Sequence, residues 1–131
     1  MDPYTTHGAF SWNALMTSDP EKAVAFYTAL LGWTVQKMAM PGMDYHVMKA
    51  GDTSVGGIMA LPPEAAAGGM PPNWGSYVTV ADVDATARKA VELGGKVVHG
   101  PAAIPGIGRF AVIIDPQGAA INVIAYAAPA G

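Results

Sequence analysis

The chain contains a segment in which apolar residues recur at the spacing of one face of an α-helix. This apolar stripe consists of Ala23, Phe26, Tyr27, Leu30 and Leu31. A repeat at every third or fourth residue is typical of an amphipathic helix that packs on a core. Asp19 is suited to cap such a helix, Pro20 to occupy its first position, and Gly32 to end it in a left-handed conformation. The pattern therefore predicts a helix over residues 20–31.

A second segment repeats this arrangement nearly half a chain length later. Asp82 takes the place of the capping residue, and Gly94-Gly95 ends the segment. Its apolar stripe consists of Val83, Ala87, Ala90 and Val91. The distance from the capping aspartate to the terminal glycine is almost the same in both segments. We therefore expect two helices of similar length in equivalent positions.

Runs of strand type flank both helices in the same order. One apolar run precedes each helix, at residues 10–17 and 76–81. Three runs follow each helix, at 34–40, 45–50 and 54–60 in the first half and at 96–99, 109–114 and 119–126 in the second. Turn-forming residues separate them at Pro41-Gly42, at Gly51-Asp52 and at 115–118. The sequence therefore predicts two copies of a strand–helix–strand–strand–strand (βαβββ) module.

The two modules are expected to form a single domain that covers residues 1–131. The first module would span about residues 8–61 and the second about 74–127, joined by a connector at 62–73 that is rich in Pro, Gly and Ala. One module of this size cannot bury its helix and both faces of its sheet alone. We therefore expect an α+β fold in which the two βαβββ modules form a curved mixed sheet around a cleft.

Charged residues are scarce and hydrophobic residues are abundant. The charged fraction is 13%, about half the usual share of a globular domain, and the hydrophobic fraction is 51%. Sparse surface charge indicates apolar area that a partner covers, so we expect a homodimer. The net charge of −3, with seven Lys and Arg along the chain, argues against a nucleic-acid partner.

The sequence also limits the compartment and the chemistry. The absence of cysteine excludes disulfides, thiolate nucleophiles and cysteine-ligated metals. No run of 18 apolar residues is present, so we expect no membrane span. The first residues lack the basic and apolar regions of a signal peptide, and we expect a cytoplasmic protein.

Taken together, several of these segments resemble the vicinal oxygen chelate superfamily, which includes glyoxalase I, bleomycin-resistance proteins and extradiol dioxygenases. The resemblance rests on Asp19-Pro20-Glu21-Lys22-Ala23 with Phe26-Tyr27 and Leu31-Gly32-Trp33, on Val80-Ala81-Asp82-Val83-Asp84-Ala85 with Leu93-Gly94-Gly95, and on Gly108-Arg109-Phe110 with Asp115-Pro116-Gln117-Gly118-Ala119. It implies the glyoxalase/bleomycin-resistance-like fold. That fold hosts lyases, isomerases, dioxygenases and drug-binding proteins, so the resemblance alone does not select an activity.

Metal-dependent members of this superfamily carry His, Gln or Glu at four inward-facing strand positions. The corresponding positions here are Trp12, Gly75, Asn122 and the pair Ile58-Met59. These side chains bind a hard or borderline divalent ion weakly or not at all. The resemblance therefore implies that this chain has lost the metal site, and we expect no metal and no other cofactor.

Strand alternation predicts which side chains line the cleft. If Trp12 faces the cleft, Leu15 packs under the helix, and if Asn122 faces the cleft, its neighbours Ile121 and Val123 face the helix. The predicted ligand-binding residues are Trp12, His46, Met48, Trp74, Tyr77, Arg109 and Asn122. An aromatic, weakly polar lining of this kind suits a small organic ligand.

Four of these residues have a structural as well as a functional interpretation. His46 is either a general base or ligand contact, or a strand histidine hydrogen-bonded at the sheet surface. Arg109 either holds a carboxylate or carbonyl group of a ligand, or forms a structural salt bridge or a hydrogen bond to the loop at 102–106. Trp74 either closes the mouth of the cleft or fixes the connector to the sheet. Met48 belongs to a group of methionines that would give an adaptable pocket wall or fill the core.

The leading hypothesis is metal-independent binding of a small aromatic or amphipathic organic molecule in the cleft. Trp12 would stack on the ligand, and Asn122 and Arg109 would orient its polar groups. One alternative is a metal-dependent lyase, isomerase or dioxygenase with an unconventional site that uses His46 or Arg109. The other is a non-catalytic interaction module whose cleft is filled by side chains. Whether the protein is an enzyme stays open on the sequence.

Overall fold

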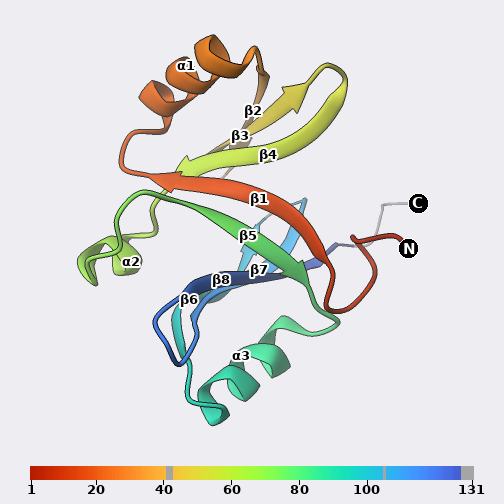
Figure 1. Cartoon of the computed structure of the whole chain (residues 1–131), viewed down its shortest axis with the longest axis vertical. Coiled ribbons are helices and arrows are strands. Elements are labelled where there is room, and N and C mark those ends of the chain that lie inside the picture. Colours follow the sequence, from red (N-terminus) through yellow and green to blue (C-terminus); the bar gives the residue numbers. More distant parts are fainter. Residues whose placement is uncertain (41–42, 105, 128–131) are drawn as a thin grey trace. The chain divides into compact units, whose positions relative to one another are not determined.

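The computed structural model describes residues 1–40, 43–104 and 106–127, in which eight strands and three helices form an α+β fold (Figure 1). The elements are β1 (Phe10–Thr17), α1 (Pro20–Leu31), β2 (Thr34–Met40), β3 (Met43–Ala50), β4 (Thr53–Ala60), α2 (Pro63–Ala67), β5 (Asn73–Thr79), α3 (Val83–Glu92), β6 (Lys96–Ile104), β7 (Gly108–Ile114) and β8 (Ala120–Tyr126). The chain divides into two compact units. We call Trp12–Gly75 the first unit, and Met1–Ser11 with Ser76–Gly131 the second unit.

In the first unit, helix α1 covers one face of strands that lie in the order β2-β3-β4-β1. Strand β1 pairs with β4 in parallel, and the other two pairs are antiparallel. The buried core between helix and strands consists of Leu15, Met48 and Ile58, and partly buried Ala23, Val24, Tyr27 and Trp33 pack against it. The helix forms at the predicted position because Asp19 accepts a hydrogen bond from the Lys22 amide and Gly32 ends it at φ 73°.

The second unit repeats the same plan. Its strands lie in the order β5-β8-β7-β6, with β5 parallel to β8. Helix α3 begins at an Asp82 cap that accepts from the Ala85 amide and covers one strand face. The core on that face consists of Val80, Val83, Ala111, Ile113 and Val123. Both predicted βαβββ modules are therefore present, each with its first and last strands paired in parallel.

Three boundaries differ from the sequence-based expectation. The connector contains the short helix α2, β5 begins at Asn73, and β6 continues to Ile104. Strand β6 passes through Pro101 because it pairs only with β7 in this unit, so the missing proline N–H interrupts no second ladder. The predicted turn at Pro41-Gly42 lies outside the described residues. None of the helices described is long and apolar enough to cross a membrane.

The first eleven residues belong to the second unit, whereas the sequence suggested that the first module starts near residue 8. Backbone hydrogen bonds join them to β5, from the Gly8 amide to the Thr79 carbonyl (2.7 Å) and from the Thr79 amide to the Ala9 carbonyl (2.8 Å). The Ala81 amide also donates to Nδ1 of His7. His7 therefore has a structural role at the N-terminal end of this segment.

A close approach between a side chain and the backbone fixes the first unit on the face away from α1. The Tyr45 ring lies directly over Gly57 of β4, in the space that a Cβ atom would need. The Asn13 carbonyl of β1 approaches the neighbouring Gly56 in the same way. The pair Gly56-Gly57 therefore allows a side chain and a neighbouring strand to approach the β4 backbone closely.

We expect Gly57→Ala to destabilise the protein by about 1–3 kcal/mol, because the added methyl group overlaps the buried Tyr45 ring. Gly68→Ala is the matched control, since a Cβ there meets only ordinary contacts; it should change the unfolding free energy by less than about 0.5 kcal/mol. Urea denaturation of both variants measures the difference. Equal stability of the two variants would contradict the packing described.

Candidate functional site

The strand face of the first unit away from α1 carries Trp12. The indole Nε1–H of Trp12 donates a 2.9 Å hydrogen bond to the Tyr45 hydroxyl, which joins β1 to β3. Trp12 is partly exposed, whereas Tyr45 is buried. Buried Ala14, Met16 and Met59 share this face, because they alternate with Leu15 and Ile58 of the helix-side core. The buried part of this face is apolar, and the indole N–H of Trp12 is already hydrogen-bonded.

The corresponding face of the second unit carries Tyr77 and Asn122. These two residues are register partners on the parallel pair β5 and β8, and only 1% of Tyr77 and 5% of Asn122 is exposed. Ile121 and Val123 face α3, as predicted from the position of Asn122. Sequence and structure thus agree on the orientation of β8.

The sequence did not indicate a cluster of three hydroxyl groups at the end of this face. The Thr79 hydroxyl donates to the Pro3 carbonyl at 2.6 Å and lies 2.9 Å from the Ser11 hydroxyl. Ser11 lies 2.7 Å from the Tyr126 hydroxyl, and burial raises the pKa of that phenol. Thr79, Ser11 and Tyr126 are far apart in sequence, and only the return of the N-terminal residues to β5 reveals their contact.

The structure places His46 and Met48 on the opposite strand face, under α1, and not with Trp12. Tyr45 and Val47 alternate with them along β3, so a strand that turns Tyr45 toward Trp12 turns His46 and Met48 toward the helix. Met48 is fully buried in the helix-side core. His46 is 3% exposed and has polar partners on both ring nitrogens. Neither side chain is therefore oriented to reach a ligand beside Trp12.

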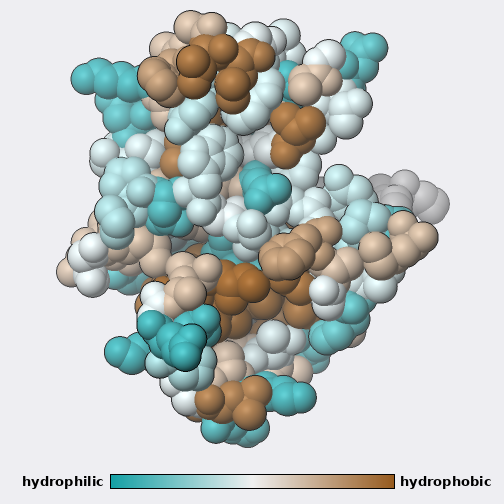
Figure 2. Space-filling model, viewed as in Figure 1, coloured by the Kyte–Doolittle hydropathy of each residue, from teal (hydrophilic) through white to brown (hydrophobic). Residues whose placement is uncertain are grey.

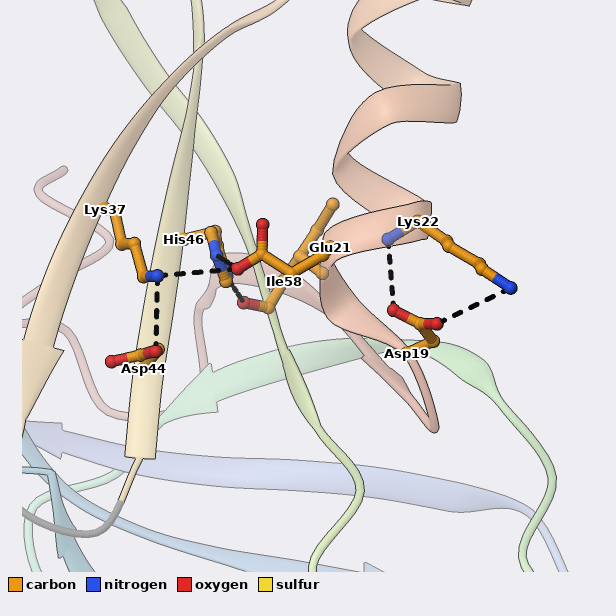
Figure 3. A network of polar contacts seen from close by, with 7 residues as sticks. All are labelled: Asp19, Glu21, Lys22, Lys37, Asp44, His46 and Ile58. Atoms are coloured by element: carbon orange, nitrogen blue, oxygen red, sulfur yellow. Dashed lines mark hydrogen bonds and ion pairs between the residues drawn. The ribbon is translucent and has the colours of Figure 1, made fainter.

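His46 joins the first turn of α1 to the sheet (Figure 3). Its Nδ1 lies 3.3 Å from the Ile58 carbonyl oxygen, and its Nε2 lies 3.2 Å from Oε1 of Glu21. Both partners are hydrogen-bond acceptors, and the tautomer of the ring determines which nitrogen donates. This arrangement corresponds to the structural interpretation of His46, a histidine hydrogen-bonded at the sheet.

Lys37 extends this network to the surface. Its ammonium lies 3.3 Å from Asp44 and 3.4 Å from Glu21 (Figure 3). The hydrogen bond and charge of Asp44, and then those of Glu21, raise the pKa of Lys37 above its usual value. The Lys37 and Glu21 side chains are mostly exposed, so water screens this part of the network. The network fastens the start of α1 to β2 and β3 and offers no unengaged base.

Arg109 and Trp74 also lie on the helix-covered sides of their units. The Arg109 guanidinium makes two 2.8 Å hydrogen bonds to the Asp84 carboxylate of α3, which is the salt bridge that the sequence left as an alternative. Trp74 packs edge-on against Tyr27 and Trp33, and its Nε1–H donates to the Tyr27 hydroxyl at 3.0 Å. Both residues thus fasten other elements to a helix.

The four positions at which the resemblance places metal ligands do not fit a divalent ion. Trp12 offers only an N–H donor, Gly75 has no side chain, and Met59 and Asn122 are weak ligands for a hard ion. Across residues 1–40, 43–104 and 106–127, no three His, Asp or Glu side chains gather closely enough to hold a metal. None of the side chains at these four positions is therefore a strong ligand for a divalent ion.

We expect His46→Ala to lower the unfolding free energy by about 2–5 kcal/mol, because it removes a buried ring and leaves a cavity. Glu21→Gln should cost no more than about 1 kcal/mol, since the Glu21 side chain is 70% exposed. Chemical denaturation of both variants measures the two effects. A cost below 1 kcal/mol for His46→Ala would refute the structural role.

We expect the contribution of Asp84 to stability to depend on pH. The hydrogen bonds from Arg109 hold the pKa of Asp84 below its usual value, so the folded state binds this proton less readily than the unfolded state. The stabilisation is complete above the ordinary Asp pKa of about 4 and is lost as the pH falls through the lower folded-state value. The stability difference between wild type and Asp84→Asn should therefore shrink between pH 5 and 2.

Arg109→Gln provides the matched background for this measurement. Adding Asp84→Asn to that variant should give a much weaker dependence on pH, because the guanidinium that lowers the pKa is gone. Urea denaturation at several pH values measures all four proteins. A stability difference that stays constant from pH 5 to 2 in the wild-type background would contradict the assignment.

Two curated relatives are similar to nearly the whole chain. A protein named putative glyoxylase CFP32, from Mycobacterium tuberculosis (strain CDC 1551 / Oshkosh), is 48% identical over 118 residues, which cover 89% of this chain and 44% of the relative. The anthracycline biosynthesis protein DnrV of Streptomyces peucetius is 38% identical over 128 residues, which cover 95% of this chain and 45% of the relative. The chain thus spans less than half the length of these relatives.

Solved structures share the fold. Methylmalonyl-CoA epimerase from Mycobacterium tuberculosis matches with a TM-score of 0.62 at 18% identity, over 95% of this chain and 92% of that chain. A variant of the Streptomyces coelicolor epimerase in complex with 2-nitronate-propionyl-CoA matches with a TM-score of 0.63 at 20% identity, over 94% and 100%. The family model described as Glyoxalase/Bleomycin resistance protein/Dioxygenase superfamily matches residues 9–123, and the chain therefore belongs to that superfamily.

Proposed function

We propose that the protein binds a small planar aromatic or amphipathic organic molecule, without a metal ion, on the strand face that carries Trp12. The observation that carries this proposal is the hydrogen bond from Trp12 to Tyr45. It occupies the indole N–H at a position where metal-dependent members of the superfamily would hold an ion. Trp12 then offers its aromatic surface, not a metal-binding atom, to a bound molecule.

The surroundings of Trp12 favour stacking as the mode of binding. Tyr45 is held in place by its close packing on Gly57, so the indole has a rigid partner and a defined orientation. Ala14, Met16 and Met59 make the rest of the face apolar and are buried, so Trp12 is the partly exposed aromatic group on it. A rigid aromatic group costs little conformational entropy when it binds, which favours affinity for flat molecules.

The names of the relatives support the same class of ligand. DnrV is named an anthracycline biosynthesis protein, and an anthracycline contains a planar system of fused rings. A molecule of that shape matches an apolar face with one oriented indole. We therefore place planar fused-ring compounds first among the candidate ligands of this chain.

A metal-dependent enzyme is the competing function, because the glyoxylase name of another relative suggests lyase chemistry. It would require metal ligands other than the side chains at Trp12, Gly75, Met59 and Asn122. His46 and Arg109 are poor substitutes, since Glu21 and Asp84 already engage them on the helix sides of their units. These contacts favour organic-ligand binding.

We expect the wild-type protein to bind an anthracycline such as daunorubicin, and Trp12→Ala to weaken that binding at least tenfold, about 1.4 kcal/mol. Loss of the stacking surface is the physical reason. Trp74→Ala is the matched control, because it removes an indole from the helix side of the same unit and should leave the affinity unchanged. Isothermal titration calorimetry measures all three affinities.

Three results would overturn the proposal. The first is equal loss of affinity in Trp12→Ala and Trp74→Ala, and the second is no binding of any planar fused-ring compound. The third is stoichiometric binding of zinc, nickel or manganese to the purified protein, which would favour the metal-dependent enzyme. Elemental analysis and metal titration by calorimetry test the third.

A further inference from the structure

A cavity of about 380 Å³ lies beside the first half of helix α1, on the helix side of the first unit. Its volume falls within the range of sites that hold small organic molecules. Leu15 lines this cavity and lies on the strand face opposite to Trp12, so the cavity is separate from the face that carries Trp12. The lining comes from β1, from α1 and from the residues that lead into β5, and it includes Leu15, Lys22, Phe26, Tyr27, Pro72 and Trp74.

Three aromatic rings give the cavity a rigid apolar wall. Phe26 and Trp74 each pack on Tyr27 at nearly right angles, with ring centroids 5.0 Å and 5.2 Å from that of Tyr27. The Trp74 Nε1–H donates to the Tyr27 hydroxyl at 3.0 Å, which fixes the two rings to each other. Their carbon surfaces therefore have little conformational freedom to lose when a ligand binds on them.

Much of this aromatic surface is in contact with solvent. Phe26 is 58% exposed and Trp74 is 40% exposed, although both line the cavity. Figure 2 shows hydrophobic residues gathered over α1 at the top of the view, where none of the twelve helix residues is buried. Exposed aromatic surface that lines a cavity of this size is typical of a binding site.

The second unit has a cavity at the equivalent place, with a different lining. That cavity, of about 270 Å³, is lined in part by the capping Asp82, by Thr86 and by Lys89. Counted from the two capping aspartates, Lys89 takes the place of Phe26, and Thr86 takes the place of Ala23. Within the described residues, this second lining includes no Phe, Tyr or Trp. The module therefore forms a cavity beside each helix, and its geometry does not require the aromatic lining of the first one.

The two charged residues of the first cavity favour an anionic ligand group. The Lys22 side chain is 88% exposed, and its ammonium lies 3.9 Å from Oδ2 of Asp19, which is too long for a hydrogen bond. Asp19 is engaged as the helix cap, because its Oδ1 accepts from the Lys22 amide. A ligand carboxylate can therefore accept from the Lys22 ammonium without disturbing the cap, whereas a ligand cation would be repelled by Lys22.

We propose that this cavity is a second small-molecule site, which binds an aromatic carboxylate with its ring against Phe26 and Trp74 and its carboxylate at Lys22. The aromatic wall supplies most of the affinity, because water screens the exposed Lys22 ammonium. The charge of Lys22 mainly orients the ligand and selects its sign. The site does not depend on ligand binding at Trp12, since the two lie on opposite strand faces of the first unit.

Isothermal titration calorimetry of the full chain with biphenyl-4-carboxylate tests the proposal. The two rings of this compound are not fused, so it differs from the planar fused-ring compounds proposed for the Trp12 face. Phe26→Ala should weaken its binding at least about fivefold, because an aromatic contact is lost. Phe10→Ala is the matched control, since Phe10 is a 67% exposed phenylalanine of the second unit, and it should leave the affinity unchanged. Trp12→Ala should also leave it unchanged.

A second pair of variants tests the sign of the ligand charge. Lys22→Gln should weaken binding of the carboxylate about threefold, and Lys89→Gln, in the equivalent cavity of the second unit, should have no effect. Biphenyl-4-ylmethylammonium should bind the wild type more weakly than the carboxylate does.

Three results would overturn the proposal: no saturable binding of the carboxylate, tighter binding of the ammonium compound, or equal losses in Phe26→Ala and Phe10→Ala. Loss of affinity in Trp12→Ala with none in Phe26→Ala would place the compound on the Trp12 face, and would overturn this proposal while leaving the proposed function intact.

Discussion

The alternation of side chains along each strand governs almost every feature of this protein. In both units a helix covers one strand face, so every residue of a strand either packs against that helix or lies on the other face. Leu15 and Trp12 take opposite sides for this reason, as do Val123 and Asn122. The helix-side positions hold the cores and the ion pairs. The remaining face of the first unit is then the one with an aromatic group presented by an apolar surface.

The polar side chains follow the same division between the helix-covered face of the strands and the other face. His46 and Arg109 are the two residues best suited to catalysis by type, yet each bonds to an acidic residue of the helix that covers it. Both contacts bind a helix to its strands. On the Trp12 face, by contrast, the indole and phenol of Trp12 and Tyr45 satisfy one another. The two polar groups on this face therefore contact each other, and its buried side chains are apolar.

The sequence predicted both helices closely, because capping aspartates and terminal glycines mark their ends. It also oriented β1 and β8, in which bulky aliphatics on one side contrast with Trp12 or Asn122 on the other. It could not orient β3 and β7. Tyr45 is buried like Met48, and Phe110 is buried like Ile113, so both faces of these strands carry buried side chains. The polar residues His46 and Arg109 lie on the helix side, so polarity does not mark the outer face of either strand.

The sequence could not predict the full length of β6 or the contacts of the N-terminal residues, for a different reason. The pairing of Gly8 and Ala9 with Thr79 is a contact between residues some seventy positions apart, and no local signal encodes it. The short helix α2 lies in a segment whose prolines and glycines normally indicate irregular structure. Tertiary packing determines these features, so the local sequence pattern does not predict them.

The contact of Trp12, Tyr45 and Gly57 also constrains how this chain can evolve. Residues in direct contact have energetic effects that do not add, by about 0.5–3 kcal/mol per pair. A histidine in place of Trp12 would remove the indole donor of Tyr45, and a side chain in place of Gly57 would displace the Tyr45 ring. The effect of a substitution at any one of these three positions therefore depends on which of the others has already changed. Such epistasis restricts the order in which the three residues can be replaced.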